Sequence, residues 1–309
     1  MALRFLRYIA RLFQEEFWLF LLLAIGLAFV FPDFGRTYLK PLALPAILTQ
    51  MYIVMLNIEP QRLLLALRAW RPLVRMVLIM FAVGPLLVLP AHGWYEPAIV
   101  LGLAVACVIP AGMSSPFFTL KFGGDAALAV VLTTLTHLMV PILAPLWVTF
   151  LAGNAMEVDS SLIFMRLVQL IVVPFALAWA TRKILGAHRT NQVYRGIAWL
   201  AGLLILVVTW GIVADITVAT VPILPLAVGV TVLNGIFFGF GLLFGGADRR
   251  TLSMTAGYRN TTLGMVLSIS VWGNPLVALP SVMWTLTQNL YAVLLLFGHR
   301  ILGNNVSQR

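Results

Sequence analysis

Ten apolar stretches, separated by short polar or charged segments, follow one another along this chain of 309 residues. An apolar helix needs roughly 20 residues to cross the hydrocarbon core of a bilayer. A hydrophobic share of 61% suits lipid better than water as the surrounding solvent. Because helices satisfy their own backbone hydrogen bonds in lipid, we predict an all-α polytopic membrane protein. The ten predicted spans are residues 17–32, 38–57, 72–91, 97–120, 126–152, 161–181, 193–214, 222–246, 251–272 and 276–298.

The basic side chains predict how these spans are oriented. The chain has 20 Lys and Arg residues against ten Asp and Glu residues, a formal net charge of +10. If the N-terminus is cytoplasmic, 16 of the 20 basic residues fall in cytoplasmic segments, and only Arg36 and Lys40 fall in outside loops. We therefore expect a multi-pass protein of the cell (inner) membrane with both termini cytoplasmic. The basic segments would contact lipid headgroups rather than nucleic acid, and residues 1–14 would form an amphipathic interfacial helix.

The spans divide into two halves of five. Residues 1–153 hold the amphipathic N-terminus and spans 1–5, and residues 154–309 hold spans 6–10. An odd number of spans in each half means that two repeats would be inverted relative to each other. The fourth span of each half carries helix breakers, which are Pro110, Gly112 and Pro116 in the first half and Gly257 and Gly264 in the second. Interrupted spans at matching positions are typical of a secondary transporter's binding site. Ordinary proline kinks are the alternative.

A fixed positive charge, Arg259, lies inside the second interrupted span. Such a charge at membrane depth costs about 2.5–3.5 kcal/mol on insertion scales, so it usually faces a cavity, a partner or a substrate. Gly257, Gly264 and polar residues surround it, and they make this stretch a poor continuous helix. A broken helix that carries a cation inside a membrane protein indicates an anion site.

Three stretches resemble the bile acid:sodium symporter (BASS) superfamily, and TQNLY (287–291) adds a shorter match. They are MYIVMLNIEPQRLLLALRAWRPLV (51–74), IPAGMSSPFFTLKFGGDAALAVVLTTLTHLMVPILAPL (109–146) and SMTAGYRNTTLGMVLS (253–268). The number and order of the spans agree with the family over nearly the whole chain. The resemblance implies a panel domain of spans 1, 2, 6 and 7 and a core domain of spans 3–5 and 8–10. It also implies that the broken spans 4 and 9 cross, with the substrate beside the crossing at the core–panel interface.

The chain resembles a divergent bacterial-type member, because several sodium-site residues of the family are replaced. Family sodium sites use carboxylate, amide and hydroxyl oxygens, as hard cations require. Pro116 stands at the amide position, Ala129 at a serine, Thr255 at the glutamate and Arg259 at the glutamine, while Thr133 is kept. We therefore expect Arg259 to replace sodium electrostatically. Transport would then be sodium-independent, by exchange, uniport or proton coupling.

The polar residues near the breaks form the candidate site. The substrate-binding candidates are Arg259, Asn260, Ser114, Ser115, Thr133 and Asn289. The ion-coupling candidates are Thr133, Thr255, His137 and Gln288. His137 lies on the same helical face as Thr133 and titrates near neutral pH, which suits proton coupling, but a histidine hydrogen-bonded within the bundle is the alternative. We expect no metal site and no cofactor, and a bound sodium ion stays open.

Two acids stand at predicted helix ends. Asp125 begins span 5, where a carboxylate favourably meets a helix N-terminus. Asp215 closes span 7 and either pairs with Arg166 or Arg259 or lies solvated at the helix end. A tight ion pair with Asp215 would make Arg259 structural.

The expected function is secondary active transport of a small organic anion by alternating access. One alternative is export of arsenite or another anion, with Cys107 as a thiolate ligand for a soft metalloid, although a buried cysteine also serves as a packing residue. Another is an anion channel or uniporter. An enzyme is not expected, because the chain has neither an HExxH-like cluster nor clustered acids for magnesium. The substrate, the direction of transport and the oligomeric state stay open.

Overall fold

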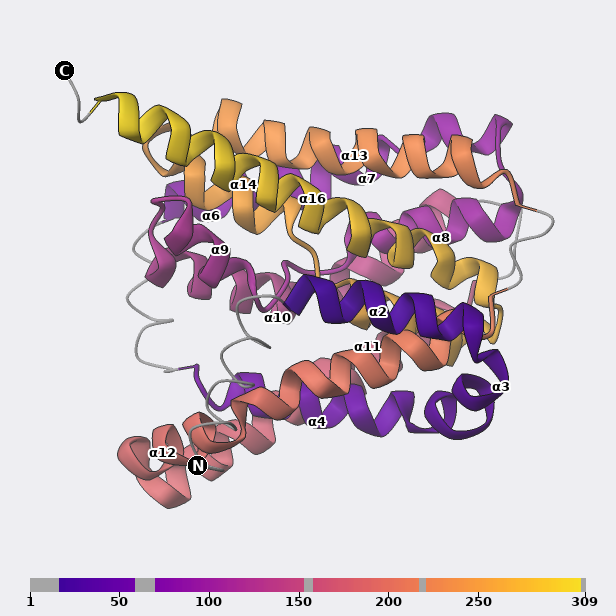
Figure 1. Ribbon diagram of the computed structural model, residues 1–309, viewed down its shortest axis with the longest axis horizontal. Helices are drawn as coiled ribbons and strands as arrows, with labels where there is room; N and C mark the ends of the chain where they lie inside the picture. The colour runs from indigo at the N-terminus through magenta and orange to yellow at the C-terminus, as the bar shows by residue number, and fades with distance from the viewer. Residues whose placement is uncertain (1–16, 59–69, 153–157, 217–220, 307–309) are drawn as a thin grey trace.

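The computed structural model describes residues 17–58, 70–152, 158–216 and 221–306, and this part of the chain is built from helices (Figure 1). The predicted amphipathic helix at residues 1–14 and the predicted boundary between the halves at residues 153–154 lie outside the described residues. In the described part, the one strand-like contact is an isolated antiparallel bridge between Ala111 and Arg259. The prediction of an all-α protein is therefore confirmed for these residues.

The helices vary in length and several are interrupted. In chain order they are α2 (Phe17–Val30), α3 (Pro32–Phe34), η1 (Gly35–Leu39), η2 (Lys40–Leu42), α4 (Ala43–Met55), α6 (Trp70–Val77), η3 (Leu78–Val83), α7 (Gly84–Leu86), η4 (Leu89–Gly93), α8 (Pro97–Val108), α9 (Ser115–Lys121), α10 (Ala126–Ala152), α11 (Ser160–Leu167), η5 (Val168–Val172), α12 (Val173–Val213), α13 (Ile223–Phe244), η6 (Gly246–Asp248), α14 (Arg249–Gly257), α15 (Thr261–Trp272) and α16 (Pro275–Val306).

Six helical stretches of the described residues are long and apolar enough to cross a membrane. They are Pro32–Met55, Trp70–Gly93, Ala126–Ala152, Ser160–Val213, Ile223–Phe244 and Pro275–Gly298, and three shorter apolar helices are Leu19–Val30, Pro97–Val108 and Thr261–Trp272. The longest stretch contains two of the predicted spans, joined at Gly186, where a φ of 79° interrupts α12. Leu146, Leu224 and Phe297 are among the large apolar side chains exposed on the outer surface, as suits contact with lipid. The chain is a multi-pass membrane protein.

Capping residues explain several helix ends. The Asp125 carboxylate accepts hydrogen bonds from the backbone N–H groups of Ala127 and Leu128, so the predicted structural role at the start of α10 is confirmed. Asp159 begins α11 in the same way, accepting from Ser161 and Leu162. These side chains replace the acceptors that the first turn of a helix lacks.

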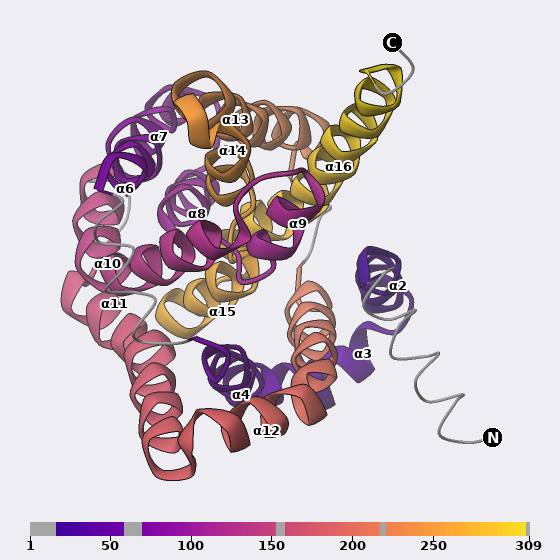
Figure 2. The same ribbon diagram turned by 90° about the vertical axis from the view of Figure 1, so that its left-hand side faces the viewer.

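The two central helices are the most deeply buried. All residues from Ala98 to Val108 in α8 are buried, as are all residues from Thr251 to Gly257 in α14. Around them, α10 and α16 pack against α8, and α13 packs against α14. Figure 2 shows α2, α4 and α12 grouped on the other side of the molecule, and α12 packs along both α2 and α4. Helix α15 contacts members of both groups and therefore lies between them.

The expectation for Asp215 is wrong on both alternatives. Its carboxylate forms ion pairs with Lys40 and with Arg36, and Arg36 also donates to the Ala214 carbonyl at 2.8 Å. The side chain is 22% exposed, so it is not a solvated helix-end acid. The segment that precedes α4 lies against the end of α12, and sequence spacing alone does not predict that contact. Arg166 donates instead to Gln169 at 3.0 Å.

Candidate functional site

Two interrupted helices meet at their breaks. Helix α8 ends at Val108, Ile109 is extended with a ψ of 153°, and helix resumes at α9. Helix α14 ends at Gly257, and Tyr258 is extended before α15 begins. The ordinary proline kink is therefore wrong as an account of these positions, because the chain leaves the helical conformation for several residues in both segments.

The backbones of the two breaks are hydrogen-bonded to each other. The Gly112 N–H donates to the Tyr258 carbonyl at 2.6 Å, and the Asn260 N–H donates to the Pro110 carbonyl at 2.9 Å. A Cβ atom at Gly112 would lie 2.7 Å from the Tyr258 ring and 2.9 Å from the Arg259 carbonyl oxygen. Glycine is needed here because only a residue without a side chain lets the two backbones approach so closely.

The guanidinium of Arg259 is buried at this crossing, and the side chain is 1% exposed. Its Nη1 donates to the Ile109 carbonyl at 3.0 Å, and its Cζ lies 4.1 Å from the centre of the Phe237 ring. Its Nε and Nη2 have no hydrogen-bond partner among the described residues. The ion pairs in that part of the chain join Arg36 and Lys40 to acids, so no carboxylate there pairs with Arg259.

The Ile109 carbonyl lies at the C-terminal end of α8, where a helix carries partial negative charge. The Arg259 guanidinium therefore occupies a position where free carbonyl oxygens attract a cation. The alternative in which an ion pair with Asp215 makes Arg259 structural does not hold, because Asp215 pairs with Lys40 and Arg36.

His137 is hydrogen-bonded on both sides of its ring. Its Nδ1 lies 2.8 Å from the Thr133 carbonyl, which can only accept, so Nδ1 carries the proton. Its Nε2 then accepts from the Asn260 Nδ2 at 3.1 Å. The Asn260 Oδ1 in turn caps α15 by accepting from the Leu263 N–H at 3.2 Å. His137 thus holds Asn260 as a neutral imidazole, the arrangement expected of a histidine bonded within the bundle.

Hydroxyl groups lie at the positions that correspond to the sodium site of the BASS superfamily, and here they are hydrogen-bonded within the protein. Ser115 and Thr133 share a hydrogen bond of 2.9 Å, and both are buried. Thr255 donates to the Thr251 carbonyl at 2.7 Å and lies 3.6 Å from the Met76 sulfur. Among the described residues, no three His, Cys, Asp or Glu side chains are grouped so that they could hold a metal ion.

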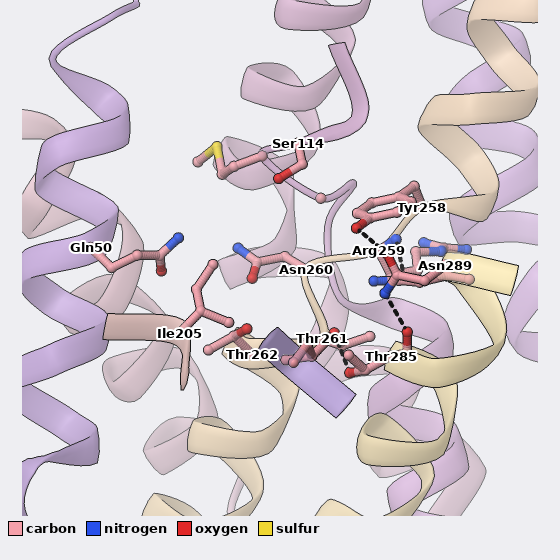
Figure 3. A pocket seen from close by; sticks show the side chains of 14 residues that line it. Gln50, Ser114, Ile205, Tyr258, Arg259, Asn260, Thr261, Thr262, Thr285 and Asn289 are labelled. Atoms are coloured by element: carbon pink, nitrogen blue, oxygen red, sulfur yellow. Dashed lines mark hydrogen bonds between the residues drawn. The ribbon is translucent and has the colours of Figure 1, made fainter. Parts of the chain in front are cut away.

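A small cavity of about 40 Å³ adjoins the crossing (Figure 3). Leu21 of α2, Gln50 of α4 and Ile205 of α12 line it from one side, and the two breaks and α16 line it from the other. Its polar lining consists of Gln50, Ser114, Tyr258, Arg259, Asn260, Thr261, Thr262, Thr285, Gln288 and Asn289. The volume is far below the roughly 300–1,000 Å³ of an organic-ligand pocket, so this conformation is closed around the site.

Five of the predicted site residues line this cavity, and the others lie behind it. The lining residues are Ser114, Arg259, Asn260, Gln288 and Asn289. Gln288 accepts from the Arg259 backbone N–H at 2.9 Å, and Asn289 accepts from the Tyr258 hydroxyl at 3.0 Å. Ser115, Thr133, His137 and Thr255 are buried in the helices around the crossing and are not among the lining residues.

Gln50 was not among the predicted site residues. It is 4% exposed, and Figure 3 shows its side chain extending toward Asn260 across the cavity. An amide inside the mostly apolar stretch of α4 is a signal that marks a functional candidate in a membrane span. Cys107, by contrast, is fully buried within α8 and does not line the cavity.

Comparison with known proteins finds transporters. Residues 15–298 match the SBF-like CPA transporter family. The probable sodium/metabolite cotransporter BASS1, chloroplastic, of Oryza sativa subsp. japonica is 29% identical over 230 residues, which are 70% of this chain and 53% of that protein. The probable sodium/metabolite cotransporter BASS2, chloroplastic, of the same plant is 24% identical over 268 residues, 85% of this chain and 58% of that protein.

A bacterial relative is the uncharacterized protein YbaS of Bacillus subtilis (strain 168), which is 25% identical over 220 residues. The aligned residues are 67% of this chain and 70% of that protein. The chain spans little more than half the length of the two plant relatives.

Proposed function

Because the chain belongs to the SBF-like CPA transporter family, as its resemblance to the BASS superfamily predicts, we propose that it is a secondary active transporter of a small organic anion. Proteins of this family are membrane transporters and not enzymes. The observation that carries the anion assignment is the Arg259 guanidinium, which is buried at the crossing of two broken helices without a carboxylate partner among the described residues.

Alternating access follows from an arrangement of ten spans in two inverted repeats, residues 1–153 and 154–309. Spans 1, 2, 6 and 7 form the panel, and spans 3–5 and 8–10 form the core. The position of the cavity supports this arrangement, since α2, α4 and α12 line it from one side and the two breaks line it from the other. Movement of the core against the panel would enlarge the cavity enough to admit a substrate. The distribution of basic residues supports placement in the cell (inner) membrane with both termini cytoplasmic.

Arg259 takes the place of a sodium ion in this proposal. Its guanidinium binds the Ile109 carbonyl at the end of α8, and the Ser115 and Thr133 hydroxyls bind each other. A second cation in this position would be repelled by the fixed charge. The site therefore keeps a positive potential without sodium, and it attracts an anion to the polar residues Ser114 and Asn260 at the cavity.

Thermal stability of the purified protein tests the proposal. A ligand at 100 times its dissociation constant raises the free energy of unfolding by about 2.7 kcal/mol. Organic anions, including bile acids and small carboxylates, are added in sodium buffer and then in choline buffer. We expect equal stabilisation in both buffers. Stabilisation that requires sodium would contradict the replacement of sodium by Arg259.

The variant Arg259→Gln separates a role in anion binding from a structural role. Removal of a buried charge that has no carboxylate partner should leave the melting temperature of the ligand-free protein unchanged or higher. Stabilisation by the anion should be lost, whereas Arg259→Lys should retain part of it because the charge is kept. A large fall in the melting temperature of Arg259→Gln without ligand would show instead that the guanidinium serves the fold.

Two alternative functions, arsenite export and an anion channel or uniporter, make different demands on the site. Arsenite export would need a thiolate at the cavity, and Cys107 is buried in α8 away from it. An anion channel or uniporter would use the same cation without a coupled ion. Uptake that is saturable and stimulated by anion on the opposite side excludes a channel, because an open pore shows neither property.

A further inference from the structure

Gln50 places an unpartnered polar group in the cavity from the panel side. Its side chain is 4% exposed, and its Oε1 is buried without a hydrogen-bond partner among the described residues. Its neighbours along α4 are mostly apolar, and the side chain extends across the cavity toward Asn260 (Figure 3). Gln50 therefore faces the crossing from a helix that belongs to the opposite group.

This arrangement does not favour the folded state. A buried acceptor that lacks a donor costs about 1–3 kcal/mol, and an apolar side chain of the same shape would avoid that cost. An unsatisfied buried polar group in a native structure calls for an explanation, and at the edge of a cavity a ligand can supply the missing partner. The unpartnered atom is the Gln50 Oε1, which accepts hydrogen bonds, so a ligand that pairs with it must carry a hydrogen-bond donor.

Donors for the charged end of an anion lie across the cavity. Thr261 and Thr262 are the first two residues of α15, so their backbone N–H groups have no acceptor within that helix. The Asn260 side chain accepts the next N–H, that of Leu263. The N–H groups of Thr261 and Thr262 stay uncapped at the end of the helix that lines the cavity. A helix of 12 residues with free N–H groups at its start favours a carboxylate or sulfonate there.

We propose that Gln50 is a specificity-determining residue that accepts a hydrogen bond from the substrate, and that the site selects small anions with a hydroxyl or amino group near the charged group. The charged group lies at the N-terminus of α15, and the neighbouring donor reaches the Gln50 Oε1 when the panel and the core close. This inference rests on the proposed function, and it adds the chemistry of the uncharged end of the substrate.

The test compares anions that differ only in one hydroxyl group. Lactate is paired with propionate, and isethionate is paired with ethanesulfonate, and binding to the full chain is measured by thermal stabilisation. In the wild-type protein we expect the hydroxylated member of a pair to bind about fivefold more tightly, the value of one additional hydrogen bond.

The variant Gln50→Met keeps the size of the side chain and removes its hydrogen-bonding atoms. We expect it to abolish the preference for the hydroxylated anion and to leave the melting temperature of the ligand-free protein unchanged or raised. Thr49→Val is the matched control. Thr49 directly precedes Gln50 on α4, its side chain is exposed, and its hydroxyl donates to the Pro45 carbonyl, so this variant should keep the preference.

Two results would overturn the role of Gln50 while leaving the proposed function intact. One is anion binding without a preference for the hydroxylated member, or a preference that survives in Gln50→Met. The other is a large loss of stability in ligand-free Gln50→Met, which would assign the side chain to the fold. If none of these anions, and no bile acid, stabilises the wild-type protein in either buffer, the proposed function fails and this inference fails with it.

Discussion

At the scale of single residues, the contacts of His137 define its role more closely than its titration does. Its Nδ1 donates to the Thr133 carbonyl and its Nε2 accepts from Asn260, so both nitrogens are used by the neutral ring. Asn260 lines the cavity and caps α15 at the same time. The described residues that contact the ring supply no acid to which a proton could pass. We therefore propose that His137 positions Asn260.

The variant His137→Gln tests this role. A glutamine amide can donate to the Thr133 carbonyl and accept from Asn260, but it cannot titrate. We expect anion uptake by reconstituted His137→Gln to match the wild type, both with and without a pH gradient. His137→Leu should lower the free energy of unfolding by about 1–3 kcal/mol, because it leaves the Asn260 amide with the Met51 sulfur as its remaining partner. Loss of a pH-gradient response in His137→Gln would instead support proton coupling.

The same residues show what sequence reasoning could and could not predict of the site. Arg259 and Asn260 were predicted because a charge and an amide stand out within an apolar span, and Asn289 was favoured by the resemblance of TQNLY to the family. Gln50 carries the same signal, but the helix that it faces is determined by packing between segments far apart in the chain. For the same reason neither expectation for Asp215, a pair with Arg166 or Arg259 or a solvated carboxylate, included Lys40, which lies 175 residues away.

At the scale of helices, the close approach of the two breaks depends on Gly112. A side chain at this position would meet the Tyr258 ring and the Arg259 carbonyl. We expect Gly112→Ala to lower the free energy of unfolding by about 1–3 kcal/mol, as overpacking of a tight contact does. Gly239→Ala in α13 is the control, because a Cβ atom there has no neighbour within 4 Å. In thermal unfolding of the purified proteins, Gly112→Ala should melt at a lower temperature than Gly239→Ala. Equal melting temperatures would contradict the need for glycine at position 112.

Prolines explain a further feature of the helices. The three π-helical turns of the described residues, η1, η3 and η5, end two residues before Pro41, Pro85 and Pro174. A proline ring within a helix clashes with the carbonyl four residues earlier, and in each case that carbonyl lies inside the π-helical turn. Widening the helix at this point makes room for the ring. The sequence predicts that a proline disturbs a helix, but whether the helix kinks, widens or breaks depends on its neighbours.

At the scale of the whole molecule, the distribution of basic residues argues for the orientation in the membrane. The segment around Gly186 joins two predicted spans and carries Arg182, Lys183 and Arg189, which predicts a cytoplasmic location. Arg36 lies between the first two predicted spans and Lys40 lies at the start of the second, and both side chains pair with Asp215. Basic residues that are neutralised in this way weigh less against an outside location.

Cysteine labelling tests this orientation without the removal of a native cysteine. Cys107 is the only cysteine of the sequence and is fully buried in α8, so the unmodified protein should not react with a membrane-impermeant maleimide. Thr37 and Ala187 are exposed and lie on opposite sides of the membrane in the proposed arrangement. We expect Thr37→Cys to be labelled in cells with an intact inner membrane and Ala187→Cys to be labelled only after that membrane is permeabilised. The reverse pattern would place both termini outside, because ten spans carry the two ends of the chain to the same side. Labelling of both variants in intact cells would contradict the number of spans between these positions.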